Sequence, residues 1–147
     1  MALRDNPMAV STEWNAELIT RMLECWNAGD VDALLEVFDP DVEVRPALST
    51  FLASMVYRGH AGVRSWYAET NEPWAELQAE PERFVDVGGH TVVVIALHAR
   101  VPGGHVDVGA RIAHVVTIRG DKIVRLEGYD EPDEALASVG LAQRQAN

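Results

Sequence analysis

Two side chains that could exchange a proton, His114 and Glu127, fall within an otherwise apolar pattern near the end of the chain. Residues 92–129 are typical of three antiparallel strands, because glycine turns at 102–105 and 119–122 separate β-rich runs. A two-residue loop in the second turn places His114 directly opposite Glu127 on one face. Such a pair suits general acid–base catalysis. It would equally suit a buried structural ion pair, and the residues leave both interpretations open.

The face that carries this pair is expected to point into the protein. Its apolar members are Val93, Ile95, Leu97, Val106, Val108, Ala110, Ile112, Val116, Ile118 and Ile123, with Tyr129 beside them. The turn at 102–105 places Ile95 opposite Ile112 and Arg100 opposite Asp107. A further hairpin at Gly88-Gly89 places Phe84 opposite Val93 on the same face.

Three helices are predicted ahead of these strands. Apolar residues recur at helical spacing over 11–28 and over 31–38, and a third helix begins at residue 59. A short strand is expected over 41–45, and a helical turn within 130–140. The predicted order is α-α-β-α-β-β-β-β, an α+β fold with helices packed on one face of a curved antiparallel sheet.

The connection from Ala47 to Tyr57 contains more apolar residues than a solvated loop needs. We interpret it either as a short helix or as a flap over a cavity.

Composition indicates one globular domain over residues 1–147, with 1–10 and 141–147 expected to fray. The chain is 48% hydrophobic and 24% charged, and its single cysteine, Cys25, excludes an internal disulfide and fits a reducing cytoplasm. A net charge of −11 argues against nucleic acid or anionic membrane as partners. No secretory signal is recognised, and the five histidines lack metal-ligand spacing, so a cytoplasmic protein without a metal ion is expected.

The second face of the strands predicts a homodimer. It carries Val94, Ala113, Val115, Val124 and Leu126, which are too many apolar side chains to leave in water.

Segments 39–44, 57–63, 113–125, 129–130 and 134–136 resemble the SnoaL-like branch of the nuclear-transport-factor-2-like superfamily, which contains the ketosteroid isomerase fold. The resemblance spans nearly the whole chain. It implies a cystatin-like conical half-barrel with a pocket between the concave sheet and the helices, often in a homodimer made through the sheets.

The resemblance also implies site residues. In the polyketide cyclases of this branch, an acid–base carboxylate on the last strand lies near a histidine of the preceding strand. Glu127 and His114 match these positions, although the cyclases have aspartate where this chain has glutamate. The side chains then expected to contact substrate are Tyr129, Trp26, Tyr57, Trp66, Phe84 and Ile112.

Two function classes follow. The first is a cofactor-independent acid–base enzyme of the isomerase, cyclase, dehydratase or hydrolase type, acting on a hydrophobic substrate that bears a carbonyl or hydroxyl group. In that case Glu127 would transfer the proton, His114 would be its partner, and Tyr129 would donate a hydrogen bond to developing oxygen charge. The second is a protein that binds a hydrophobic ligand, or forms a dimeric module, without catalysis.

Overall fold

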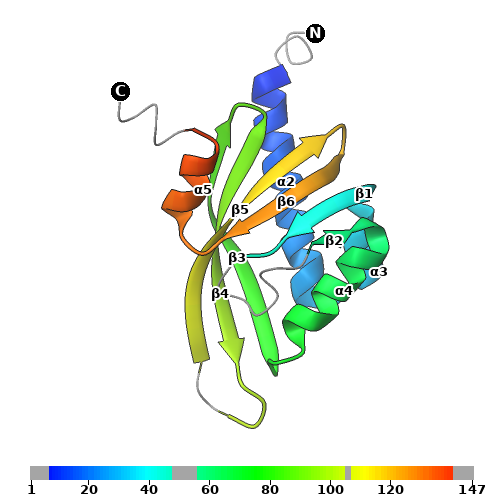
Figure 1. Ribbon diagram of the computed structural model, residues 1–147, viewed down its shortest axis with the longest axis vertical. Helices are drawn as coiled ribbons and strands as arrows, with labels where there is room; N and C mark the ends of the chain where they lie inside the picture. Colours follow the sequence, from blue (N-terminus) through cyan, green and yellow to red (C-terminus); the bar gives the residue numbers. More distant parts are fainter. Residues whose placement is uncertain (1–6, 48–55, 105–106, 141–147) are drawn as a thin grey trace.

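The computed structural model describes residues 7–47, 56–104 and 107–140 (Figure 1). Its elements are α2 (Pro7–Ala28), α3 (Val31–Glu36), β1 (Phe38–Arg45), β2 (Tyr57–Arg58), α4 (Gly59–Asn71), β3 (Glu76–Val87), β4 (His90–Arg100), β5 (Asp107–Arg119), β6 (Lys122–Tyr129) and α5 (Pro132–Ser138). The strands form one sheet in the order β2-β1-β6-β5-β4-β3. β1 runs parallel to β6, and the other neighbours are antiparallel. The predicted α+β fold with a curved sheet is confirmed.

Two helix boundaries differ from the prediction. The first helix begins at Pro7, so residues 7–10, which were expected to fray, are helical. Proline suits this position, because a first-turn N–H has no partner within the helix. The second helix ends at Glu36 instead of continuing to Phe38. Phe38 begins β1 because pairing with β6, including a 2.9 Å bond from Ile123 N to the Val37 carbonyl, outweighs one more helical turn.

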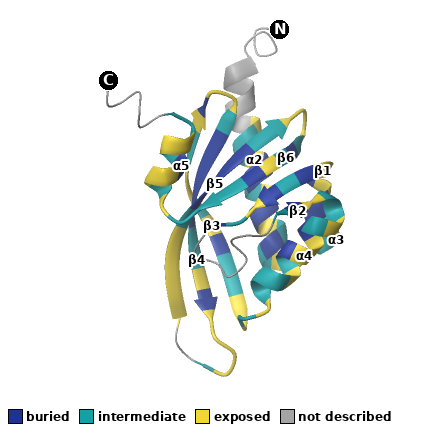
Figure 2. Ribbon diagram, in the orientation of Figure 1, coloured by how far each residue is buried: buried dark blue, intermediate teal, exposed yellow. Residues whose placement is uncertain are grey.

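The main core lies between the concave sheet face and α2, α3 and α4 (Figure 2). Its fully buried side chains include Ile19, Met22, Leu34, Phe38, Val63, Val93, Ile95, Val116, Ile123 and Leu126. Most of the predicted interior face is confirmed by this burial. Val108, with 43% of its surface exposed, and Ala110, also exposed, are exceptions, because residues 107–111 of β5 extend beyond the end of β6. Val106 lies outside the described residues.

Two of the three predicted strand registers are correct. β3 and β4 pair Phe84 with Val93. β4 and β5 pair Ile95 with Ile112, and they pair Arg100 with Asp107 at the open end. The register set by the turn at 102–105 runs without interruption along β4 and β5. The register set at Gly88-Gly89 holds from Val87 to Arg83 and then shifts by one residue before Pro81, beyond the predicted pair.

The third register is wrong from its third pair onward. β5 and β6 pair Arg119 with Lys122 and Ile118 with Ile123, as predicted, but Thr117 then pairs with Arg125. Val124 is thus an extra residue in β6, a β-bulge. A shift of one residue turns every later side chain of the strand to the other face.

The bulge changes the partner and the face of every residue at the end of β6. His114 lies opposite Gly128, Val115 opposite Glu127, and Ala113 opposite Tyr129. Leu126, expected on the outer face, is instead fully buried in the main core. Glu127 and Tyr129, expected on the interior face, belong to the outer one.

The path of the chain directly after β1, at Pro46 and Ala47, explains why β5 and β6 adopt the bulged register. β1 pairs with β6 as far as Arg45 opposite Glu127, and the next residues cross over Gly128. A Cβ atom placed on Gly128 would lie 2.6 Å from the Ala47 nitrogen and 3.1 Å from the Pro46 carbonyl carbon. Only glycine fits beneath this crossing, and the bulge brings Gly128 there in place of Glu127.

The outer face is covered by the C-terminal helix. Val92, Ala113 and Val115 form a second buried cluster with Ala135 of α5, and Tyr129 packs against this cluster. The apolar surface that motivated the homodimer is therefore largely covered within the chain, so that reason for a dimer is wrong. The dimer itself stays a prediction.

Substituting Gly128 tests this crossing. Gly128→Ala is expected to lower the free energy of unfolding by about 1–3 kcal/mol, because the new methyl group overlaps the Pro46–Ala47 backbone. Gly109→Ala is a matched control in β5, where a Cβ would meet only the Leu97 carbonyl oxygen at 3.9 Å. Urea unfolding of both variants measures the difference, and equal stabilities would show that the crossing is not tight.

Candidate functional site

A cavity of about 150 Å³ lies between α2, α4 and the concave face of β3, β4 and β5. The described residues around it are almost all apolar: Met22, Leu23, Trp26, Pro46, Ala47, Trp66, Thr70, Leu77, Ala79, Ile95, Leu97, Ala110, Ile112 and His114. Four predicted site residues are among them, namely Trp26, Trp66, Ile112 and His114. Of the predicted flap, residues 48–55 lie outside the described part of the chain, and Ala47 borders the cavity.

Aromatic rings from the helices form one wall. The rings of Trp26 in α2 and Trp66 in α4 have centroids 4.7 Å apart, and Trp66 lies 6.3 Å from the His114 ring. Asn27 fixes this wall to the free edge of β3. Its Nδ2 donates to the Ala79 carbonyl at 2.8 Å, and the Ala79 N–H donates to its Oδ1 at 2.9 Å. The side chain thus binds the strand backbone as another strand would.

His114 is buried at the side of the cavity with no charged partner among the described residues. Only 8% of its surface is exposed, and within the described ranges its Nδ1 has no hydrogen-bond partner. Burial without a compensating charge disfavours the imidazolium and lowers the pKa of His114 to about 4. The ring is therefore neutral at pH 7. It has an unused nitrogen beside an apolar cavity.

Thr70, in the last turn of α4, is a second polar group at the cavity. Its Oγ1 is buried and makes no hydrogen bond to any residue that the structure describes. Helical spacing places Thr70 on the same side of this helix as Trp66, but it does not show that the side chain reaches a cavity, because that depends on how α4 packs against the sheet.

Glu127 does not reach this cavity. It lies opposite Val115 on the outer face, and its Oε2 accepts a 3.3 Å hydrogen bond from Arg125. The expected contact with His114 is therefore wrong, for the reason given by the bulge at Val124. Among the described residues, no Asp or Glu lines the cavity.

Three predicted substrate contacts also lie elsewhere. Tyr129 is on the outer face beside α5, and Phe84 packs into the main core. Tyr57 is buried, and its hydroxyl donates a 2.9 Å hydrogen bond to Glu69. Burial, together with this bond, raises the pKa of Tyr57 to about 12 and keeps the phenol neutral. None of the three is among the residues that line the cavity.

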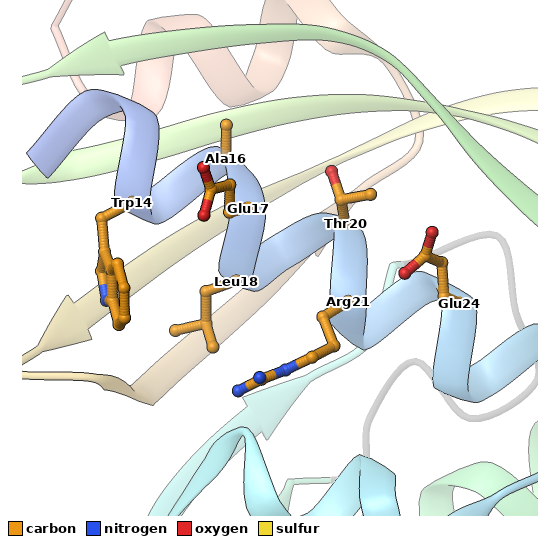
Figure 3. Close-up of a pocket in the computed structure, with 7 residues that line it drawn as sticks. All are labelled: Trp14, Ala16, Glu17, Leu18, Thr20, Arg21 and Glu24. Atoms are coloured by element: carbon orange, nitrogen blue, oxygen red, sulfur yellow. The ribbon is translucent and has the colours of Figure 1, made fainter.

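A larger hollow of about 470 Å³ follows α2, but it is a weaker candidate (Figure 3). Trp14, Leu18 and Arg21 point to one side of the helix there, and Trp14 is 47% exposed. The described residues that line it all come from this one helix. A ligand site normally gathers polar groups from several elements, as the cavity at His114 does.

Within the described ranges, no group of three or more His, Cys, Asp or Glu side chains could hold a metal ion. No described helix is long and apolar enough to span a membrane.

The burial of His114 predicts a pH dependence of stability. The unfolded imidazole has its ordinary pKa of 6.5, so between pH 6.5 and about 4 the unfolded chain binds a proton that the folded chain does not. Stability therefore falls as the pH drops through this window, by about 3 kcal/mol from this group alone.

Urea unfolding of wild type and His114→Gln at pH 7 and pH 4 isolates this contribution. The variant is expected to lose less stability on acidification than the wild type does. His98→Gln, at an exposed histidine, is the matched control. An equal loss in wild type and His114→Gln would mean that His114 titrates alike in both states.

Comparisons with known proteins agree with the fold. A protein named TerC, crystallised with polyporic acid, is 21% identical, with 86% of this chain and 97% of that chain covered and a TM-score of 0.71. A nuclear-transport-factor-2-like protein from Burkholderia pseudomallei is 19% identical, with 86% and 98% covered and a TM-score of 0.70. A protein from Catenulispora acidiphila with a ketosteroid-isomerase-like fold, in complex with trimethylamine, is 18% identical, with 85% and 93% covered and a TM-score of 0.68.

No curated protein matches the sequence. The sequence model of the SnoaL-like domain family matches residues 19–126, which is more than half of the chain. This range includes α3, α4, β1–β5 and all the described residues that line the cavity. The chain therefore belongs to the SnoaL-like domain family.

Proposed function

We propose that this protein binds a small, mainly apolar molecule in the cavity beside His114, and that an oxygen of this molecule forms a hydrogen bond with the imidazole. One observation carries the proposal: the buried Nδ1 of His114 has no partner among the described residues. An unsatisfied buried polar group costs about 1–3 kcal/mol. A ligand oxygen at this nitrogen would recover part of that cost.

The size of the cavity limits the ligand. Its volume of about 150 Å³ is comparable to that of an engineered apolar cavity that binds benzene. The described walls therefore suit a single ring better than a fused polycyclic molecule. Trp26 and Trp66 offer aromatic surface for such a ring.

The charge of the cavity favours a neutral ligand. The described lining contains no Lys, Arg, Asp or Glu, and its one histidine is neutral at pH 7. An anion in this cavity would lose its hydration without gaining a cation.

A second candidate function is acid–base catalysis by His114. The observation that favours it is a neutral imidazole, the one titratable side chain of the described lining, held beside the cavity. It could take a proton from a carbon next to a ligand carbonyl and return it to another carbon, without a cofactor. The SnoaL-like domain and the likeness to a protein described as a polyketide cyclase support this class. A pKa near 4 makes His114 a weak base until a ligand changes its surroundings.

Binding of simple ring compounds tests the first proposal. Wild type is expected to bind phenol more tightly than toluene by about 0.5–1.5 kcal/mol, the net value of one hydrogen bond. His114→Phe should lose this preference and still bind toluene, since an aromatic ring without a hydrogen-bonding nitrogen replaces the imidazole. His98→Phe is the control. Calorimetric titration measures both ligands, and equal affinities in wild type, or no binding of either, would contradict the proposal.

Proton exchange tests the second candidate. Wild type should accelerate exchange of the α-hydrogens of cyclohexanone with D₂O, followed by NMR, and His114→Phe should lose about 10²–10⁴-fold of that rate. If exchange is no faster than in buffer while the ligand still binds, catalysis by His114 is contradicted and the protein only binds the ligand.

A further inference from the structure

We infer that Thr70 is a second polar anchor of the cavity, and that the ligand is a neutral, ring-sized molecule with two oxygen functions, one bound by His114 and the other by Thr70. This inference rests on the proposed function. It adds a specificity-determining residue and narrows the class of ligand.

The state of the Thr70 hydroxyl is the first step. A threonine hydroxyl within a helix commonly bonds a backbone carbonyl three or four residues earlier. Three residues before Thr70, the Tyr67 carbonyl accepts a 2.8 Å hydrogen bond from Asn71 Nδ2 instead. Oγ1 of Thr70 is buried and has no partner in the described part of the chain. Its hydrogen-bonding capacity is therefore not used by the described residues.

The coincidence of two such atoms is the second step. Thr70 Oγ1 and His114 Nδ1 are the two buried side-chain polar atoms without a partner among the described residues, and both residues line the same cavity of about 150 Å³. Native proteins contain few unsatisfied buried groups, and each calls for a reason. A ligand that bonds both atoms provides one reason for both.

A ligand bound to both Thr70 and His114 would connect the helical layer with the sheet. Thr70 belongs to α4 in the helical layer, whereas His114 belongs to β5 in the sheet. Because each residue is held on a separate rigid element, their spacing should select among ligands by the separation of two oxygens. A ligand with one oxygen would leave one of the two groups unsatisfied or bound to a trapped water.

The polar groups of the cavity lining indicate the chemical class of the ligand. Both a hydroxyl and a neutral imidazole can donate or accept a hydrogen bond, so each accommodates a hydroxyl or a carbonyl oxygen. Neither supplies a positive charge at pH 7, and the described lining has no Lys or Arg. Hydroxylated or carbonyl-bearing rings therefore fit, and carboxylates and phosphates do not.

A set of four probes tests this inference: phenol and the 1,2-, 1,3- and 1,4-benzenediols. In wild type, one diol is expected to bind about 3- to 10-fold more tightly than phenol, the value of one further net hydrogen bond. Thr70→Val keeps the shape of the side chain and should reduce that diol to the affinity of phenol, with phenol itself unchanged. Thr20→Val, at a half-buried helical threonine outside the cavity, is the matched control.

Thermal melting of the empty proteins gives an independent readout. Thr70→Val should melt at a higher temperature than wild type, because it removes an unsatisfied buried hydroxyl. A lower melting temperature would show that the hydroxyl supports the fold, and it would overturn the inference.

The binding outcomes separate the two proposals. Phenol binding without a preferred diol, or a diol preference that survives in Thr70→Val, would overturn the role of Thr70 and leave the proposed function standing. Failure of every probe to bind wild type would overturn both.

Discussion

The backbone at Pro46 and Ala47 passes so close to β6 that the strand must present a residue without a side chain beneath it. This steric constraint fixes the end of the sheet. The bulge at Val124 supplies Gly128 at the crossing and, by the same shift, buries Leu126 in the main core. An ordinary two-residue hairpin without the bulge would direct Leu126 outward and a glutamate into the crossing, at the combined cost of a lost core side chain and a steric overlap.

The chemistry of the cavity follows from the same constraint. With Glu127 on the outer face, the described lining retains one titratable side chain, His114, and burial keeps it neutral at pH 7. A histidine paired with a carboxylate would be held as an imidazolium or shuttle a proton within the pair. A lone neutral histidine instead directs its hydrogen-bonding capacity to whatever occupies the cavity. The Thr70 hydroxyl, on the facing helix, is in the same state.

Much of the architecture could be predicted from the sequence, because periodicity and glycine turns are local signals. They identified the helices, every strand except the two-residue β2, and two of three hairpin registers. The third prediction failed because the turn at residues 119–122 fixes only the first two pairs. The bulge beyond these pairs depends on the contact of Gly128 with Pro46 and Ala47, which are far away in the chain. The isolated Gly128 within a strand pattern was the available signal, since such a glycine often marks a bulge or a close backbone approach. The role of Thr70 depends on packing between layers, which no local pattern encodes.

The register of β5 and β6 around His114 is the claim on which the site depends, and NMR can observe it directly. In an antiparallel ladder, alternate pairs bring their Hα atoms close together. The structure predicts such an Hα–Hα contact either between His114 and Gly128 or between Val115 and Glu127, which are adjacent pairs. An Hα–Hα contact between His114 and Glu127 would instead show an uninterrupted hairpin, return the carboxylate to the cavity and contradict the account.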